Sequence, residues 1–179
     1  MFLVTIHLEL SNQTMLKTSL SVAALILLSG CSTLSSVKKM TANASPQIEQ
    51  GQQLPTTAIA KISDTTIQLE VAQTPQQQAT GLMFRESLAD DRGMLFPFPN
   101  ERMARFWMKN VPISLDMIFL NGDRVVGIAS DVPPCKAEPC PVYGPNALVD
   151  GVIELRGGRA QELAVEVGDT IEIVSTELN

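Results

Sequence analysis

The chain has 179 residues, of which 45% are hydrophobic, and a formal net charge of −6. An acidic chain is a poor candidate for binding nucleic acid or an anionic lipid surface, because both attract basic proteins. The length suits one domain with a tether and is sufficient to bury a hydrophobic core. We therefore expect one globular domain and no nucleic-acid partner.

The first 31 residues have the form of a bacterial lipoprotein signal. Lys17 supplies a positive charge, residues 20–28 form an apolar segment too short to span a bilayer, and residues 28–31 read Leu-Ser-Gly-Cys. We interpret residues 1–30 as a signal peptide. The similarity to lipoproteins implies that Cys31 is lipidated and begins the mature chain. The alternatives are an ordinary secretory signal or a buried helix.

Two further interpretations concern the segments on either side of this signal. Met15 begins a complete signal by itself, so residues 1–14 are interpreted as an upstream extension from a misassigned start. Residues 31–56 are predicted to be the lipidated cysteine and a flexible tether, since they are rich in polar residues and proline. Ser32 is not aspartate, which in similar Gram-negative lipoproteins favours the outer membrane. We expect a lipid anchor on the periplasmic face of that membrane in the cell envelope.

The only histidine of the chain, His7, lies inside the predicted signal peptide. The mature chain then has no imidazole, which excludes Ser–His and Cys–His nucleophiles and the usual zinc and copper ligand sets. We predict no metal and no cofactor.

The folded domain is predicted to span residues 57–179. Residues 58–62 and 66–71 show strand alternation and predict an opening antiparallel pair. The pattern Thr74-Pro75-x-Gln77 is typical of an N-cap, a first helical residue and a capping-box partner, and it predicts a helix to about Arg85. The remaining predicted elements are strands at 93–96 and 104–109, a hairpin of 117–120 with 125–129, a strand at 148–155, a short helix within 159–165 and a strand at 170–174.

Five of the eleven prolines lie in residues 131–146, which predicts a stiff, irregular loop. The loop contains Cys135 and Cys140, and we predict a disulfide between them that contributes about 2 kcal/mol in the chain-entropy model. Two thiolates alone do not complete a closed tetrahedral metal site. Their four intervening residues also differ from a thioredoxin-like motif. Many short strands with one or two helices indicate a mainly β fold, a β sandwich or barrel.

Three separated blocks of sequence resemble a known family. They are Gly-Leu-Met-Phe-Arg-Glu-Ser-Leu at 81–88, Asp-Arg-Gly-Met-Leu-Phe at 91–96, and Phe-Trp-Met-Lys-Asn at 106–110 followed by 112–116. The chain resembles the family called domain of unknown function 192 from about Ile67 to Val174. That resemblance implies a mainly β, jelly-roll-like domain, often exported, without an established activity. Val111 departs from the threonine that is frequent at this position.

Alternation along residues 105–109 places Arg105, Trp107 and Lys109 on one face and Phe106 and Met108 on the other. An aromatic ring between two cations suits a carboxylate, phosphate or sugar ligand. We therefore predict a ligand site made of five residues, Arg85, Arg105, Trp107, Lys109 and Asp116. The alternative is that Trp107 packs in the core and the charges are solvated or paired with Glu86, Glu101 and Asp116.

Two functions follow from these residues. The first is a non-catalytic binding module for a small anionic or carbohydrate ligand, or for an envelope protein. The second is a histidine-free hydrolase of the cell envelope that uses carboxylates, with Asp116 and Asp91 or Glu86 as the pair. The alternation that places Arg105, Trp107 and Lys109 on one face favours the binding module.

Overall fold

The structure is a computed structural model that describes residues 51–176. The predictions for the signal peptide, for Cys31 and for residues 31–50 lie outside these residues. Within the described part, no helix is long and apolar enough to cross a membrane.

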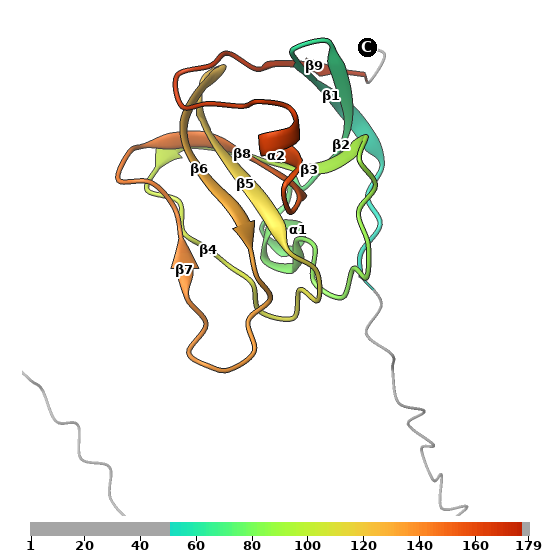
Figure 1. The fold of residues 1–179 in the computed structure, drawn as a ribbon, viewed down its shortest axis with the longest axis vertical. Helices are drawn as coiled ribbons and strands as arrows, with labels where there is room; N and C mark the ends of the chain where they lie inside the picture. The colour runs from blue at the N-terminus through green and yellow to red at the C-terminus, as the bar shows by residue number, and fades with distance from the viewer. Residues whose placement is uncertain (1–50, 177–179) are drawn as a thin grey trace, which may run out of the picture. The chain divides into compact units, whose positions relative to one another are not determined.

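A seven-stranded sheet forms most of the domain, in the order β6-β5-β8-β3-β2-β1-β9 (Figure 1). Neighbouring strands are antiparallel, except that β2 and β3 are parallel, and the helix α1 (Pro75–Thr80) lies in the connection between them. The strands are β1 (Thr56–Ile62), β2 (Thr65–Val71), β3 (Arg92–Arg102), β5 (Leu115–Asn121), β6 (Arg124–Val132), β8 (Val149–Arg156) and β9 (Glu172–Ser175).

The sheet curls until its two ends meet. A bridge joins Arg124, the first residue of β6, to Thr170, and the amide of Val125 donates to the carbonyl of Asp169 at 2.9 Å. The segment that enters β9 therefore pairs with the opposite edge strand, which reduces the length of unpaired edge. The predicted mainly β fold is confirmed.

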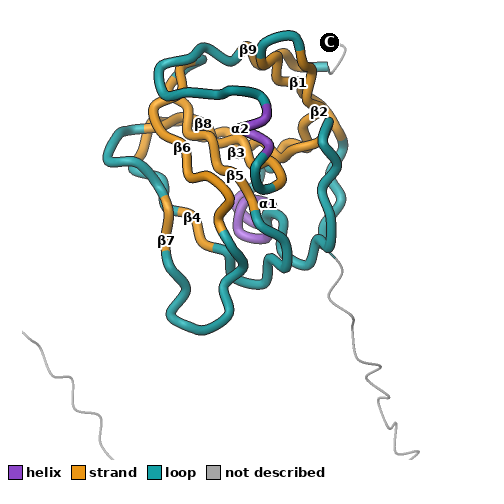
Figure 2. Tube along the Cα trace, viewed as in Figure 1, coloured by secondary structure: helices purple, strands orange, loops and turns teal. Residues whose placement is uncertain are grey.

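A second sheet of two strands, β4 (Phe106–Trp107) and β7 (Val142–Tyr143), lies beside the main one. Figure 2 shows that residues 133–141, between β6 and β7, form a loop. The loop predicted at 131–146 is therefore shorter than expected, because β6 continues to Val132 and β7 lies within the predicted span. Cys135 and Cys140 are joined there by a disulfide, with their Cα atoms 5.6 Å apart. The predicted strand at 104–109 is shorter than expected, since only residues 106–107 pair.

The opening strand pair and the hairpin around Asn121-Gly122 are confirmed. The capping box is also confirmed, because Gln77 N donates to Thr74 Oγ1 at 3.2 Å and Thr74 N donates to Gln77 Oε1 at 2.9 Å. The predicted length of this helix is wrong. It ends at Thr80 because Gly81 adopts a positive φ of 49°, a conformation that favours glycine and stops the helix.

Side chains of the central strands bury apolar groups on both faces of the sheet. One cluster contains Met94, Phe96, Met117 and Phe119. The other contains alternate residues of the same strands and the second helix, α2 (Arg159–Glu162), which packs through Ala160. The sheet therefore has two hydrophobic layers, as in a curled sheet that surrounds one core and is covered on its outer side.

Residues 52 and 54, which the sequence assigns to the tether, contact the folded domain. Arg85 Nε donates to the carbonyl of Gln52 at 2.6 Å, and the amide of Leu54 donates to Glu70 Oε2 at 2.7 Å. Gln52 in turn donates to the carbonyls of Gln77 and Gly81, at 2.8 and 2.9 Å. Composition alone predicts a tether here, because a polar segment that binds to a folded surface has the same kinds of residue as a polar segment that is solvated.

Candidate functional site

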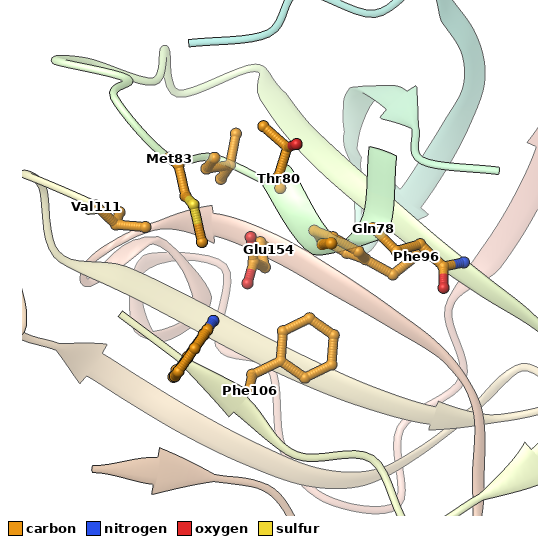
Figure 3. Close-up of a pocket in the computed structure, with 11 residues that line it drawn as sticks. Gln78, Thr80, Met83, Phe96, Phe106, Val111 and Glu154 are labelled. Carbon is orange, nitrogen blue, oxygen red and sulfur yellow. The ribbon is translucent and has the colours of Figure 1, made fainter. Parts of the chain in front are cut away.

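A small cavity lies between α1, the segment after it, and strands β3, β4 and β8 (Figure 3). We call it the inner chamber, and its volume is about 40 Å³. This is enough room for a few water molecules or one small chemical group. Its lining consists of Gln78, Ala79, Thr80, Gly81, Leu82, Met83, Phe96, Phe106, Trp107, Val111 and Glu154.

Glu154 is the single acidic residue in the lining of the inner chamber, which contains no basic residue. It lies on β8, and its cross-strand neighbours are Met94 on β3 and Met117 on β5, both fully buried. Only 4% of Glu154 is exposed. Figure 3 shows its carboxyl group between Met83 and Val111 on one side and Phe96 and Phe106 on the other.

No side chain or backbone group in the described part of the chain forms a hydrogen bond or ion pair with the Glu154 carboxyl. Among residues 51–176, every fully occluded side-chain polar atom has a partner. The carboxyl oxygens of Glu154 are therefore not sealed in the core, and they face the open space of the inner chamber. A polar group in this position is costly for the folded state unless water or a ligand pairs with it.

Burial raises the pKa of Glu154 from the ordinary 4.5 to about 8. The cause is desolvation, because removal from water disfavours the charged form and no neighbouring cation compensates. The group is mostly protonated at neutral pH. Groups with a shifted pKa that face a cavity are typical of functional sites.

Local backbone geometry shapes the wall of the chamber. Gly81 ends α1 with a positive φ, a backbone conformation that residues with a side chain rarely adopt. A Cβ atom at this position would also lie 3.4 Å from the ring of Phe96. Phe84 and Asn110 also have positive φ values, 61° and 58°, and the amide of Phe84 donates to the carbonyl of Asn110 at 2.7 Å. Such sparsely populated conformations concentrate near sites of function. This hydrogen bond ties the segment after α1 to the segment after β4.

A second, larger cavity adjoins the inner chamber and shares five lining residues with it, namely Gln78, Ala79, Phe96, Phe106 and Trp107. We call it the outer pocket, and its volume is about 380 Å³. Arg102 and Arg105 add two cations to its lining. The two cavities together form one site with an apolar and acidic inner end and a basic outer end.

The structure divides the five residues that the sequence predicts as a ligand site. Trp107 is 49% exposed and lines both cavities, and Arg105 lines the outer pocket. Lys109 Nζ lies 2.6 Å from Glu138 and 5.5 Å from the centre of the Trp107 ring, and it lines a different cavity beside the disulfide. The predicted alternation is present, since Met108 is buried and Phe106 packs against Phe96 with ring centres 5.1 Å apart.

Arg85 and Asp116 do not join Trp107. Arg85 is buried, and its Nη2 lies 2.6 Å from Glu70 Oε2. Asp116 is fully buried and accepts hydrogen bonds from the amides of Asp131, Gly158 and Ala160, at 2.6, 3.0 and 2.6 Å. These two side chains hold backbone segments together. Their charges predict a ligand site, but both side chains are buried and paired within the protein, which gives them a structural role.

Sequence reasoning missed Glu154, although a signal for it exists. The run Val-Ile-Glu-Leu at 152–155 lies in a strand of continuous apolar character, which is typical of a strand buried on both faces. A carboxylate inside such a run is rarely buried without a partner. A glutamate within a continuous apolar strand is therefore a stronger sequence signal for a site than a charge on a half-exposed strand.

The family indicated by the sequence motifs is also the family whose model matches the chain. The family model of DUF192, described as "Uncharacterized ACR", matches residues 58–173. The chain belongs to this family. The match includes the strands that line the two cavities, β3, β4 and β8, so the candidate site lies within the DUF192 domain. None of the curated proteins matches the chain.

Two solved structures resemble this DUF192 domain. One is a protein of unknown function from Novosphingobium aromaticivorans DSM 12444, with 34% identity and a TM-score of 0.59, covering 65% of this chain and 83% of that one. The other, from Sinorhizobium meliloti 1021, is described as a proposed transcription regulator. It has 30% identity and a TM-score of 0.60, and the match covers 68% of this chain and 97% of that one.

Glu154→Gln tests the state of the buried carboxyl through the pH dependence of stability. Because the pKa is raised on folding, the folded protein keeps a proton that the unfolded chain releases between the ordinary value of 4.5 and about 8. Wild-type stability should therefore fall by roughly 4 kcal/mol between pH 5 and pH 8 through this group, and the glutamine variant should lose that contribution.

Urea unfolding at pH 5, 6.5 and 8 measures the difference between the two proteins. Glu172→Gln is the matched control, because Glu172 is an exposed carboxylate paired with Lys61, and it should keep the wild-type pH profile. Parallel profiles for wild type and Glu154→Gln would contradict the raised pKa.

Proposed function

We propose that the protein is a lipoprotein of the cell envelope whose folded domain is a non-catalytic binding module for a small ligand. The observation that carries the proposal is Glu154, a carboxyl that is buried, has no partner within residues 51–176 and faces a cavity with Trp107 at its exposed side. A bound ligand would supply the hydrogen bonds that the protein does not. Burial of the unpaired carboxyl destabilises the ligand-free protein. A ligand that pairs with the carboxyl removes this cost, so the free energy of binding becomes more favourable.

The two cavities set limits on the ligand. The inner chamber accepts one small group, and the aromatic surfaces of Phe96, Phe106 and Trp107 offer contact with an apolar stem or a sugar face. An anionic group is disfavoured there, because the negative faces of the rings repel it, as does the Glu154 carboxyl once it is ionised. Arg102 and Arg105 make the outer pocket the place for any anionic part of the ligand.

The proposed location depends on the amino-terminal sequence. The run Leu-Ser-Gly-Cys at 28–31 and the polar segment after it support a lipid anchor at Cys31. The disulfide between Cys135 and Cys140 agrees with an oxidising compartment such as the periplasm. A lipid anchor on the periplasmic face of the outer membrane would place the two cavities where small envelope molecules reach them.

A carboxylate-pair hydrolase receives less support from the geometry. Asp116 pairs with Leu155 across β5 and β8, while Met117 pairs with Glu154, so Asp116 and Glu154 point to opposite faces of the sheet. Asp116 is also occupied by three backbone amides. A single raised-pKa carboxyl remains, which could act as a general acid but has no second carboxylate in the lining of the inner chamber.

The description of the Sinorhizobium protein suggests a different class of partner, namely nucleic acid. A net charge of −6 works against this class for the present chain, because affinity for nucleic acid depends on the release of counterions by Lys and Arg. We therefore retain a small ligand as the proposed partner.

Binding can be followed through Trp107, which is the single tryptophan of the chain. A panel of sugars, amines, carboxylates and amino acids should contain compounds that change its fluorescence in a saturable way. Ala79→Phe should abolish the change, since Ala79 is exposed on α1 and lines both cavities. Gln76→Phe is the matched control, because Gln76 is exposed on the same helix and lies in neither lining.

The binding proposal fails if every compound leaves the fluorescence unchanged, or if Ala79→Phe binds as well as the control. Thermal unfolding of both variants in the absence of ligand shows whether either substitution disturbs the fold.

Lipidation is tested separately from binding. Cells that express the protein with labelled palmitate should incorporate the label, and the protein should appear in the membrane fraction. Cys31→Ala should remove the label, whereas the double variant Cys135→Ser/Cys140→Ser should keep it. Recovery of unlabelled wild-type protein in the cytosol with an intact leader would refute the lipid anchor.

A further inference from the structure

We infer that the inner chamber binds a primary ammonium group, and that Arg102 binds an anionic group on the other end of the same ligand. The ligand class is thus a small zwitterion with an amine and an acid separated by an apolar stem. This inference rests on the proposed function and names its ligand chemistry.

The first argument is the balance of hydrogen-bond donors and acceptors. Gln78 uses Nε2 to donate to the carbonyls of Ala72 and Pro97, at 3.1 and 2.8 Å, and the Thr80 hydroxyl donates to the carbonyl of Gln76 at 3.1 Å. The side-chain donors of Gln78 and Thr80 are therefore occupied, while the Glu154 carboxyl has no partner among the described residues. The other side-chain donor of the lining is the single indole N–H of Trp107, which forms no hydrogen bond within residues 51–176 and cannot satisfy both carboxyl oxygens by itself. A ligand that brings donors satisfies this site, and an ammonium group brings three.

The second argument is the character of the chamber walls. Three aromatic side chains, Phe96, Phe106 and Trp107, line the chamber with one carboxyl and no cation. Ring faces attract a cation, and a carboxylate neutralises it, so this combination is typical of sites for alkylammonium groups. The volume of about 40 Å³ limits the occupant to a head group on a narrow stem.

The third argument concerns the outer pocket, where the rest of the ligand would lie. The guanidinium of Arg102 lies 3.8 Å from the centre of the Phe98 ring, and it forms no ion pair with any residue in 51–176. Arg105, in contrast, donates to the carbonyls of Ala104 and Pro145 at 2.9 and 2.8 Å. Arg102 is thus the cation of the outer pocket that is available to a carboxylate or phosphate.

Binding of an ammonium ion should depend on pH, because the ligand prefers the ionised carboxyl. Burial raises the pKa of Glu154 to about 8, so below this pH the protein must release a proton to bind the cation. The lining of the inner chamber holds no other titratable side chain, and the arginines of the outer pocket stay charged. Alkylammonium ions also stay charged up to about pH 10. The apparent affinity should therefore rise roughly a hundredfold from pH 6 to pH 9.

The experiment titrates the purified protein with 6-aminohexanoate, n-hexylammonium, 6-hydroxyhexanoate and Nα-acetyl-lysine amide. The signal of the Trp107 indole N–H in proton–nitrogen NMR spectra reports binding, and sodium chloride keeps the ionic strength constant. We expect 6-aminohexanoate to bind at least tenfold more tightly than 6-hydroxyhexanoate at pH 9. Glu154→Gln should remove this preference and the pH dependence, while Glu172→Gln should bind as wild type does.

The remaining comparison identifies the source of the amine. If the ligand is a small zwitterion, 6-aminohexanoate should bind more tightly than Nα-acetyl-lysine amide, which has the amine but no carboxylate. Arg102→Gln should then abolish this difference in affinity. The reverse order would overturn the role of Arg102 and point to a lysine side chain of a partner polypeptide.

The same titrations distinguish a protein that lacks an ammonium site from one that binds no small ligand. Equal binding of the hydroxy and amino compounds, or unchanged amine binding in Glu154→Gln, would overturn the ammonium site. The binding module would still stand if a sugar or another neutral compound bound in a way that Ala79→Phe abolishes. If no compound of either set shifts the Trp107 signal, both proposals are wrong.

Discussion

The candidate site depends on a carboxyl group that an interior strand of the sheet buries without a partner among residues 51–176. Glu154 lies on β8, between β5 and β3, where its neighbours across the sheet are Met117 and Met94. These side chains exclude water and offer no charge, so the carboxyl has access to polar contact only through the inner chamber. The apolar surroundings of Glu154 thus favour a partner from outside the protein.

Three buried acids of this domain show why Glu154 is different. Glu70 pairs with Arg85 and accepts the amide of Leu54, which fixes the segment before β1. Asp116 accepts three backbone amides and joins β5 to β6 and α2. Both are satisfied by the protein itself, as buried polar groups almost always are. Glu154 has no such partner in the described residues, and it is the acid that lines a cavity.

The sequence predicts the fold better than the site, for physical reasons. The capping box of Thr74 and Gln77, the Asn121-Gly122 turn and the alternation of Phe106 and Met108 are local patterns, and the structure contains all three. The helix ends earlier than predicted because Gly81 leaves the helical region of backbone conformation. The site depends on long-range pairing, which local patterns do not reveal. The charges of Arg85 and Asp116 are paired with other groups of the protein and are not available to a ligand. Trp107 and Glu154 line one chamber because the short β4 strand lies against the main sheet.

Glu154 is protonated at neutral pH because it is buried without a partner among residues 51–176. The most direct test is to follow the carboxyl carbon of Glu154 by carbon NMR as the pH is changed, with Glu154→Gln used to assign the signal. The account predicts a titration midpoint near pH 8. A midpoint near the ordinary value of 4.5 would contradict it, because the carboxyl would then be solvated or paired.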